Sequence, residues 1–452
     1  MKQVILIFSL LIFSFSSFAQ IEGTWNGNIE LPTGKLPFVL HITNENNELK
    51  ATSDSPSQGA FGIEMNEVRF ENNILYLKQN QLMMTYEGTL VDDQNIQGTF
   101  KQGSYSFTLN LTKGDFKQNR PQEPQPPFDY KTEDITFENK ESGIKLAGTL
   151  TLPNGNGKFP IVILAAGSGP NDRNEEIYGH KPFLVLADHL TKNGYAVLRY
   201  DKRGVAESEG DYAAATVFDF ANDTKAAIEY LKTRKEIDNK KIGILGHSEG
   251  GQVAQIIASE YASIDFIILM GSPGIKGSEL MVLQNDALSK AMNIPEFTRA
   301  LNKKVNEKTY EIIMTNDSKE KADKELKEYF KTTVHFRNLT DEELDGRIKG
   351  IYNEHYRQLL LFDPMDYLPK INCNVLAING TKDVQVTSVE NLAGISKGLG
   401  MKGNLDIISY EGLNHLFQLA TTGLPNEYGE IETTIEPKVL EDILQWLNEK
   451  VK

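Results

Sequence analysis

Short segments in which apolar and polar residues alternate fill residues 21–113. They are IEGTWNGNIEL, LPFVLHITNE, LKATSDS, EVRFENNILYLKQ, MMTYEGTLVD, NIQGTFKQ and YSFTLNLTK. Asn-Asn, Asp-Asp-Gln-Asn and Gly-Ser sequences, which favour turns, lie between or within these segments. The pattern predicts an all-β N-terminal domain over residues 20–113, built as a small antiparallel barrel or sandwich of about seven strands.

A different pattern begins after residues 114–130, which carry four prolines and little to bury and are therefore predicted to be an extended linker. Two alternating segments come first, DITFEN and IKLAGTLTLP. They are followed by FPIVILAAG, YAVLRYD, KIGILGH, DFIILMGS, NVLAING and LDIISYE, most of which are nearly continuous apolar runs. Helical segments such as 217–235 separate the runs. Residues 131–452 are therefore predicted to form an α/β domain with a mostly parallel sheet covered on both faces.

One stretch of this second domain interrupts the alternation of strands and helices. Residues 275–367 hold no strand pattern but contain several amphipathic helical segments, including KEKADKELKEYFKTTV. Functional loops of α/β proteins follow the carboxyl ends of strands, so we expect a helical lid over an active site. The alternative is an added helical subdomain without a gating role.

The first nineteen residues have the composition of an export signal. Lys2 precedes an apolar run that ends in Ser17-Phe18-Ala19, a small-x-small cleavage pattern, so we expect a signal peptide over 1–19 with cleavage before Gln20. The run is short and contains several serines, which disfavours a membrane span. The protein is thus predicted to be exported to the periplasm or the exterior; the alternative is an uncleaved anchor.

Composition narrows the function further. The chain has 452 residues with 40% hydrophobic and 24% charged residues, and its net charge of −15 disfavours binding to nucleic acid or to anionic membranes. A single cysteine, Cys373, excludes an intrachain disulfide and a cysteine-based metal site. Only seven histidines are present, none paired at metal-ligand spacing, so we expect no metal and no other cofactor.

The sequence GHSEGG over Gly246–Gly251 marks a candidate nucleophile, Ser248. It follows the apolar run KIGIL and precedes a predicted helix, GGQVAQIIASEYA. A serine on a sharp turn between strand and helix has an exposed Oγ, and the glycines around it allow the strained backbone. The alternative is an N-capping serine at an ordinary turn.

A serine nucleophile requires a general base and an acid that orients the base, both downstream when the chain order is Ser, Asp, His. Asp383 follows the predicted strand NVLAIN, and His415 follows the predicted strand LDIISY. His415 is the only histidine after Asp383, so it is the candidate base. The alternatives are an Asp that caps its loop and a packed histidine.

The predicted oxyanion hole comes from two backbone N–H groups. One belongs to Glu249, the residue after the nucleophile, and the other to the loop AAGSGP after the strand IVIL, where Ser168 is favoured and Gly169 is next. A dinucleotide-binding reading of this loop is disfavoured because its third glycine is missing. Nearby Arg173 is predicted either to hold a substrate carboxylate or to form a structural salt bridge. The charges of Asp201-Lys202-Arg203 are expected to pair internally and brace their turn; the alternative is direct contact with the substrate.

These motifs resemble the α/β-hydrolase superfamily, in particular its prolyl-oligopeptidase and dienelactone-hydrolase-like esterase branch. Gly246–Gly251 resembles the nucleophile turn of that branch, Asp201–Gly204 the turn after its fourth strand, Gly380–Asp383 its acid loop and Asn414–Phe417 its histidine loop. The resemblance covers residues 131–452. With a β-domain in front, the chain is similar to exported bacterial two-domain esterases of this branch.

Two positions depart from the pattern of the branch. Ala166 stands where a histidine usually precedes the oxyanion glycine, which leaves the second donor open, and Thr387 stands where the acid loop often has proline. No β-propeller precedes the α/β domain, which argues against an oligopeptidase that selects substrates by size.

The sequence therefore predicts a serine hydrolase, most simply a carboxylesterase that transfers a short or aromatic acyl group to Ser248 and then to water. The expected partner is a small-molecule ester. A serine exopeptidase of the same fold is the first alternative. The second is an exported binding protein whose β-domain captures a ligand while the α/β domain is inert.

Overall fold

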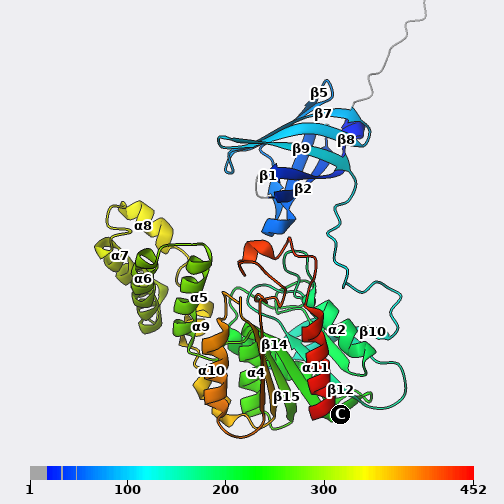
Figure 1. Ribbon diagram of the computed structural model, residues 1–452, viewed down its shortest axis with the longest axis vertical. Helices are drawn as coiled ribbons and strands as arrows, with labels where there is room; N and C mark the ends of the chain where they lie inside the picture. Colours follow the sequence, from blue (N-terminus) through cyan, green and yellow to red (C-terminus); the bar gives the residue numbers. More distant parts are fainter. Residues whose placement is uncertain (1–17, 32–33, 47, 452) are drawn as a thin grey trace, which may run out of the picture. The chain divides into compact units, whose positions relative to one another are not determined.

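A computed structural model describes residues 18–31, 34–46 and 48–451 of the chain. The chain divides between Asn119 and Arg120 into two compact units, and each has its own hydrophobic core (Figure 1). Residues 1–17, which make up most of the predicted signal peptide, lie outside the described residues. Within the described part of the chain, no helix combines the length and apolar character that crossing a bilayer requires.

The first unit is a single antiparallel sheet in the order β4-β3-β2-β1-β9-β8-β7-β6-β5. Its strands are β1 (Gly23–Leu31), β2 (Gly34–Glu45), β3 (Glu48–Ser55), β4 (Ala60–Glu64), β5 (Glu67–Glu71), β6 (Ile74–Gln79), β7 (Met84–Asp92), β8 (Asn95–Gln102) and β9 (Tyr105–Lys113). A four-residue helix, α1 (Phe18–Ile21), precedes them. The sheet curls around apolar side chains that include the fully buried Trp25 and Tyr86 (Figure 1).

The expected count of seven strands was wrong, because the sheet has nine. The segment EVRFENNILYLKQ forms two strands, β5 and β6, joined at Asn72 and Asn73, which both have a positive φ that suits a tight turn. Strand β4 was missed because its five residues are all exposed or partly buried, so it has no clear apolar face. Of the two expected forms, barrel or sandwich, a single curled sheet is closer to a barrel.

The second unit contains an eight-stranded sheet in the order β10-β11-β13-β12-β14-β15-β16-β17. Its strands are β10 (Lys131–Asn139), β11 (Ile144–Leu152), β12 (Phe159–Ala165), β13 (Ala196–Tyr200), β14 (Ile237–His247), β15 (Ile264–Met270), β16 (Asn374–Gly380) and β17 (Leu405–Tyr410). Strands β10 and β11 pair antiparallel, β11 meets β13 antiparallel, and all later pairs are parallel. The prediction of a mostly parallel α/β sheet is confirmed.

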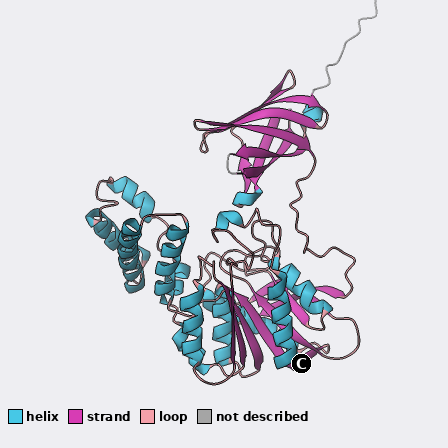
Figure 2. Ribbon diagram, in the orientation of Figure 1, coloured by secondary structure: helices cyan, strands magenta, loops and turns pink. Residues whose placement is uncertain are grey.

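Helices cover both faces of this sheet (Figure 2). They are α2 (Pro182–Lys192), α3 (Val217–Lys232), α4 (Glu249–Glu260), α10 (Ser388–Leu399) and α11 (Pro437–Lys450). In β12, Ile161 and Ile163 face the core under α3, α4 and α10, whereas Val162 and Leu164 face the core under α2 and α11. Because successive side chains of a strand point to opposite faces, a strand covered on both faces must be apolar throughout.

The segment between β15 and β16 is helical, as expected (Figure 2). Its helices are α5 (Gly277–Ala291), α6 (Glu296–Thr315), α7 (Lys319–Thr332), α8 (Asp341–Ile348) and α9 (Glu354–Leu361). They have apolar clusters of their own, one around Tyr310 and Ile313 and one around Ile312 and Leu326. The insertion leaves the sheet at the carboxyl end of β15, the edge at which α/β proteins bind ligands.

Part of the proline-rich segment belongs to the second unit. The Arg120 guanidinium donates to the backbone carbonyls of Gly179 and Ile431, and the Gln122 amide exchanges hydrogen bonds with the backbone of Ile435. Residues 114–119 fall in the first unit. The segment from Arg120 onward is therefore fixed along the second unit rather than free over its whole length.

Candidate active site

Ser248 occupies the turn between β14 and α4. Its backbone has φ 52° and ψ −117°, a strained conformation for a residue with a side chain. It stands at the N-cap position of α4, yet its side chain makes no capping hydrogen bond, which leaves Oγ available. The turn is tight: a Cβ on Gly246 would lie 2.1 Å from the Gly250 carbonyl oxygen, and one on Gly250 would lie 1.9 Å from that of Ala165. These glycines allow α4 to begin directly against the sheet.

Asp383 and His415 lie in the loops after β16 and β17 and form a buried pair. His415 Nδ1 lies 2.7 Å from Asp383 Oδ2, and both side chains are at most 5% exposed. The other carboxylate oxygen of Asp383 accepts the backbone N–H groups of Gln385 and Val386, each at 2.8 Å. The carboxylate is thus held on both oxygens, and it orients the imidazole so that Nε2 faces away from it.

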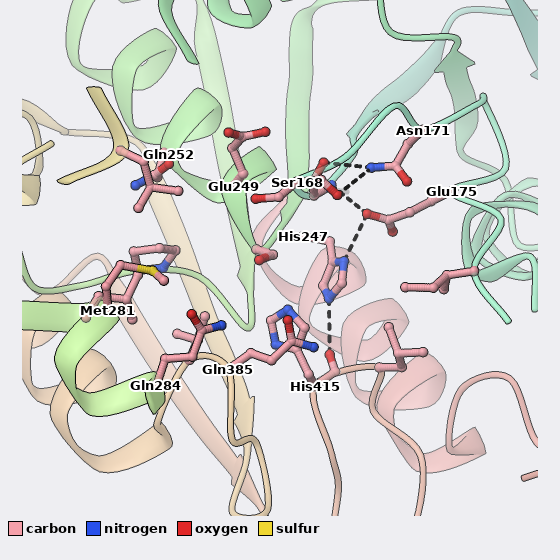
Figure 3. A pocket seen from close by; sticks show the side chains of 18 of the residues that line it. Ser168, Asn171, Glu175, His247, Glu249, Gln252, Met281, Gln284, Gln385 and His415 are labelled. Atoms are coloured by element: carbon pink, nitrogen blue, oxygen red, sulfur yellow. Dashed lines mark hydrogen bonds and ion pairs between the residues drawn. The ribbon is translucent and has the colours of Figure 1, made fainter. Parts of the chain in front are cut away.

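Ser248 and His415 line one cavity of about 330 Å³ at the carboxyl ends of the strands. Figure 3 shows His415 and other residues of this cavity. The helical insertion supplies one wall through α5 and α9. The lining residues are Gly167, Ser168, Asn171, Glu175, Ile177, His247, Ser248, Glu249, Gln252, Pro273, Leu280, Met281, Gln284, His355, Tyr356, Leu359, Gln385, Val386, His415 and Leu416. Asp383 lies behind His415, outside this lining.

The backbone N–H groups of Glu249 and Ser168 lie at the cavity and have no acceptor among the described residues. Glu249 is the first residue of α4, so its N–H has no partner within the helix. In the loop after β12, the Gly167 N–H donates to Glu175 at 2.5 Å and the Gly169 N–H to the Tyr212 hydroxyl at 3.0 Å. The Ser168 N–H between them has no acceptor among the described residues. Of the two candidates in this loop, Ser168 and Gly169, only Ser168 retains a free donor.

A second histidine–carboxylate pair lies beside the first (Figure 3). His247 Nδ1 is 3.0 Å from Glu175 Oε1, and His247 Nε2 is 3.1 Å from the backbone oxygen of His415. The rings of His247 and His415 lie 4.8 Å apart. Burial alone would lower the pKa of His247, but the charge of Glu175 and the hydrogen bond to it outweigh burial and raise that pKa above its usual value. The pair links the loop after β12 to the loop after β17.

The side chain of Glu249 receives two cationic partners. Lys202 Nζ lies 2.9 Å from one carboxylate oxygen, and His355 Nε2, from α9 of the insertion, lies 3.1 Å from the other. Burial would raise the pKa of Glu249, but Lys202 and His355 overcome that effect and lower it to about 2. The hydrogen bond to Glu249 also raises the pKa of His355. The insertion is thus tied to the residue that follows Ser248.

The expectation that the charges of the turn after β13 pair with one another was wrong. Asp201 binds Arg173 at 2.6 Å, Lys202 binds Glu249, and Arg203 binds Asp223 at 2.7 Å. Each charge therefore fastens the turn to a different element. Arg173 also forms an ion pair with Glu207 and does not line the cavity. Of the two roles expected for Arg173, the structure therefore shows the salt bridge and not a contact at the cavity.

The described residues include no group of three or more His, Cys, Asp or Glu side chains suited to hold a metal ion. The chemistry that the cavity offers is nucleophilic attack by a hydroxyl, proton transfer by an imidazole and hydrogen-bond donation from backbone N–H groups. These are the elements of acyl transfer.

Three residues of the site were not predicted from sequence. Glu175 and His247 lie 72 residues apart, and only the position of His247 inside the GHSEGG motif hinted at a role. His355 lies in a helical insertion that carries no motif. Its place beside Glu249 depends on how α9 packs, which the sequence pattern does not specify.

A mostly parallel sheet with a serine, an aspartate and a histidine in the loops after its strands is the arrangement of the α/β hydrolases. Within the second unit, residues 181–337 match the family described as serine aminopeptidase, S33. The expectation of an α/β hydrolase preceded by an all-β unit is confirmed, and the chain is a hydrolytic enzyme.

Individual proteins are similar over longer stretches. The chain is 26% identical over 440 residues to esterase EstD of Thermotoga maritima, covering 91% of this chain and 93% of that one. The esterase Pf2001 of Pyrococcus furiosus has 16% identity and a TM-score of 0.44, covering 75% of this chain and 100% of that one. Est1E of Butyrivibrio proteoclasticus, solved with ferulic acid bound, has 19% identity and a TM-score of 0.44, covering 70% and 99%.

Proposed function

We propose that this protein is a serine carboxylesterase that hydrolyses small-molecule esters through an acyl-enzyme on Ser248. The observation that carries the proposal is Ser248, whose backbone is strained and whose side chain makes no capping hydrogen bond. Ser248 lines the same cavity as His415, which is paired with the buried Asp383. The similarity to an esterase over nine-tenths of the chain supports the same reaction.

In the first half of the reaction, Ser248 Oγ attacks the ester carbonyl carbon while His415 Nε2 takes its proton. Asp383 stabilises the imidazolium that forms. Negative charge collects on the carbonyl oxygen, and the N–H groups of Glu249 and Ser168 donate to it, assisted by the N-terminus of α4. His415 then returns the proton to the leaving alcohol, which departs and leaves the acyl group on Ser248.

In the second half, His415 activates a water molecule that attacks the acyl-enzyme. The same N–H groups stabilise the second tetrahedral intermediate, and Ser248 leaves with the proton from His415. Apart from the water, the groups that act on the substrate in this cycle belong to the chain itself. Apolar side chains such as Leu280, Met281 and Leu359 bound a cavity suited to a short or aromatic acyl group.

A serine exopeptidase is the second candidate, since the matching family is described as a serine aminopeptidase. An aminopeptidase needs a carboxylate that binds the substrate's free amino group. The two carboxylates in the lining are engaged, Glu175 by Gly167 and His247 and Glu249 by Lys202 and His355. This pairing favours an ester as the substrate.

The test is turnover of p-nitrophenyl acetate, butyrate and octanoate by the protein and by Ser248→Ala. We expect turnover of the shorter esters and its loss in Ser248→Ala, which retains the melting temperature of the parent. Aminoacyl p-nitroanilides are measured alongside. Turnover of the anilides but of no ester would overturn the esterase proposal in favour of the peptidase.

We also propose that the protein is exported after cleavage between Ala19 and Gln20. Ile21, the second residue after the proposed cleavage position, is fully buried and its carbonyl accepts the Trp25 indole N–H, so the core of the first unit needs the chain from that residue onward. N-terminal sequencing of protein recovered from the periplasm or medium tests this proposal. A chain that begins at Gln20 is expected, and one that still begins at Met1 would contradict it.

A further inference from the structure

The proposed mechanism assigns no role to Gln252, a polar residue of the cavity. Gln252 lies on α4, is 1% exposed and lines the same cavity as Ser248. Its Nε2 is buried without a hydrogen-bond partner among the described residues, and no hydrogen bond of its Oε1 is found there either. Buried amides are nearly always satisfied, because burial removes the water that would otherwise bind them. An unsatisfied amide at a ligand cavity points to a partner that arrives with the substrate.

The position of Gln252 on α4 directs it to the reacting centre. Ser248 is the N-cap residue of α4 and Gln252 lies about one helical turn further along, a rise of about 6 Å, and both residues line the cavity. Helical side chains tilt toward the N-terminus of their helix, which brings the Gln252 amide toward Ser248. A substrate group a few bonds from the carbonyl carbon is within its reach.

A second amide faces the cavity from the insertion. Gln284, on α5, also lines the cavity and makes no hydrogen bond with the described residues. Figure 3 shows Gln252, Met281 and Gln284 along one side of the pocket, with Asn171 and Glu175 on the other. Met281 lies between the two amides, and Leu280 also contributes an apolar side chain to the lining. This side of the cavity thus combines an apolar surface with two free amides and no unpaired charge.

The substrate part that meets these amides follows from the proposed mechanism. The leaving alcohol must face His415, which protonates it, and the carbonyl oxygen must face the Glu249 and Ser168 N–H groups. The acyl chain takes the remaining direction, between α4 and α5. We propose that Gln252 selects esters whose acyl chain carries a neutral carbonyl or hydroxyl oxygen about three carbons from the reacting carbonyl. This inference rests on the proposed esterase function.

The test compares two acyl groups of nearly equal shape, p-nitrophenyl 4-oxopentanoate and p-nitrophenyl 4-methylpentanoate. They differ in whether the fourth carbon carries an oxygen or a methyl group. We expect kcat/KM of the protein to favour the oxo ester by about tenfold or more, because a site built around a hydrogen bond rejects an analogue that cannot form it. Gln252→Met, which keeps the side-chain length and volume, is expected to bring the ratio to about one.

The control is Gln445→Met, the same replacement at an exposed glutamine of α11 outside the cavity lining, which is expected to leave the ratio unchanged. A ratio near one in the parent protein overturns the inference, whether or not Gln252→Met folds. So does a ratio that Gln252→Met leaves intact. Turnover of both esters at equal rates refutes only the specificity, whereas turnover of neither refutes the esterase function on which it rests.

Discussion

Two buried histidine–carboxylate pairs lie side by side at the carboxyl ends of the parallel strands. They differ in what surrounds Nε2 of the imidazole. In both pairs Nδ1 of the imidazole meets a carboxylate oxygen, at 2.7 Å for His415 and 3.0 Å for His247. Nε2 of His247 is bound to the His415 backbone oxygen, whereas Nε2 of His415 makes no hydrogen bond with the described residues and belongs to a ring that lines the cavity.

The comparison shows that a carboxylate partner does not by itself make a histidine a general base. A base must exchange a proton with the reacting group, so the nitrogen opposite the carboxylate must be free. In His247 that nitrogen is hydrogen-bonded to the backbone oxygen of His415. Glu175 accepts the Gly167 N–H and so holds the loop that carries Ser168. The first pair is proposed to do chemistry, and the second to position the loops that do it.

The largest effect is expected from His415→Gln. Removing the proposed base leaves Ser248 with no group to take its proton, so kcat for p-nitrophenyl butyrate should fall by about 10³–10⁴-fold. The melting temperature is expected to change little, because the replacement keeps a polar side chain near Asp383. A fall of less than tenfold would show that another group, with His247 the first suspect, serves as the base.

His247→Ala is expected to act in the opposite way, mainly on stability. It leaves the buried Glu175 carboxylate without its imidazolium, which should lower the free energy of unfolding by about 3 kcal/mol in urea titrations. The loss in kcat should be at most about 10²-fold, from misplaced loops. A variant as stable as the parent but devoid of activity would assign the chemistry to His247.

The pH dependence of stability sharpens this assignment. Because folding raises the pKa of His247, its contribution to stability is fully present below pH 6.5 and is lost as pH rises through the raised value. Unfolding free energies measured from pH 6 to pH 9 should therefore fall more steeply in the parent than in His247→Ala. Parallel curves would contradict an imidazolium at this position.

The smallest effect is expected from His355→Gln, which weakens the tie between the insertion and Glu249. Glu249 has a lowered pKa and His355 a raised one, so the tie is complete between about pH 4.5 and 6.5. It weakens as pH rises through the raised pKa of His355 or falls toward about 2. Lys202 and Tyr212 also face His355, and Lys202 continues to compensate Glu249, so the expected loss of stability is about 1 kcal/mol.

Hydrogen exchange in α9 measures this effect. Exchange at pH 6 should be faster in His355→Gln than in the parent, and the difference should shrink at pH 9. His335→Gln, an exposed histidine of the same insertion, serves as the control. Equal exchange in all three proteins would refute a role for His355 in holding the insertion.

The strands of the eight-stranded sheet could be predicted from the sequence, because strands buried on both faces appear as nearly continuous apolar runs. Ser248, Asp383 and His415 could be proposed together because each lies within five residues of the end of a predicted strand, and the carboxyl ends of parallel strands meet at one edge. Strand β4 could not be predicted, since its residues show no clear buried face. Glu175, His355 and the unsatisfied amide of Gln252 were beyond prediction, because their roles depend on tertiary contacts between segments distant in the chain.

The central claim is that Ser248 is the nucleophile and that His415 rather than His247 activates it. The most direct measurement is the rate of labelling by diisopropyl fluorophosphate, with the modified peptide identified by mass spectrometry, in the parent, Ser248→Ala, His415→Gln and His247→Ala. The account predicts one adduct on Ser248, none in Ser248→Ala, labelling slowed at least about 10²-fold in His415→Gln and far less in His247→Ala. An adduct on another residue, or labelling that depends on His247 and not on His415, would contradict it.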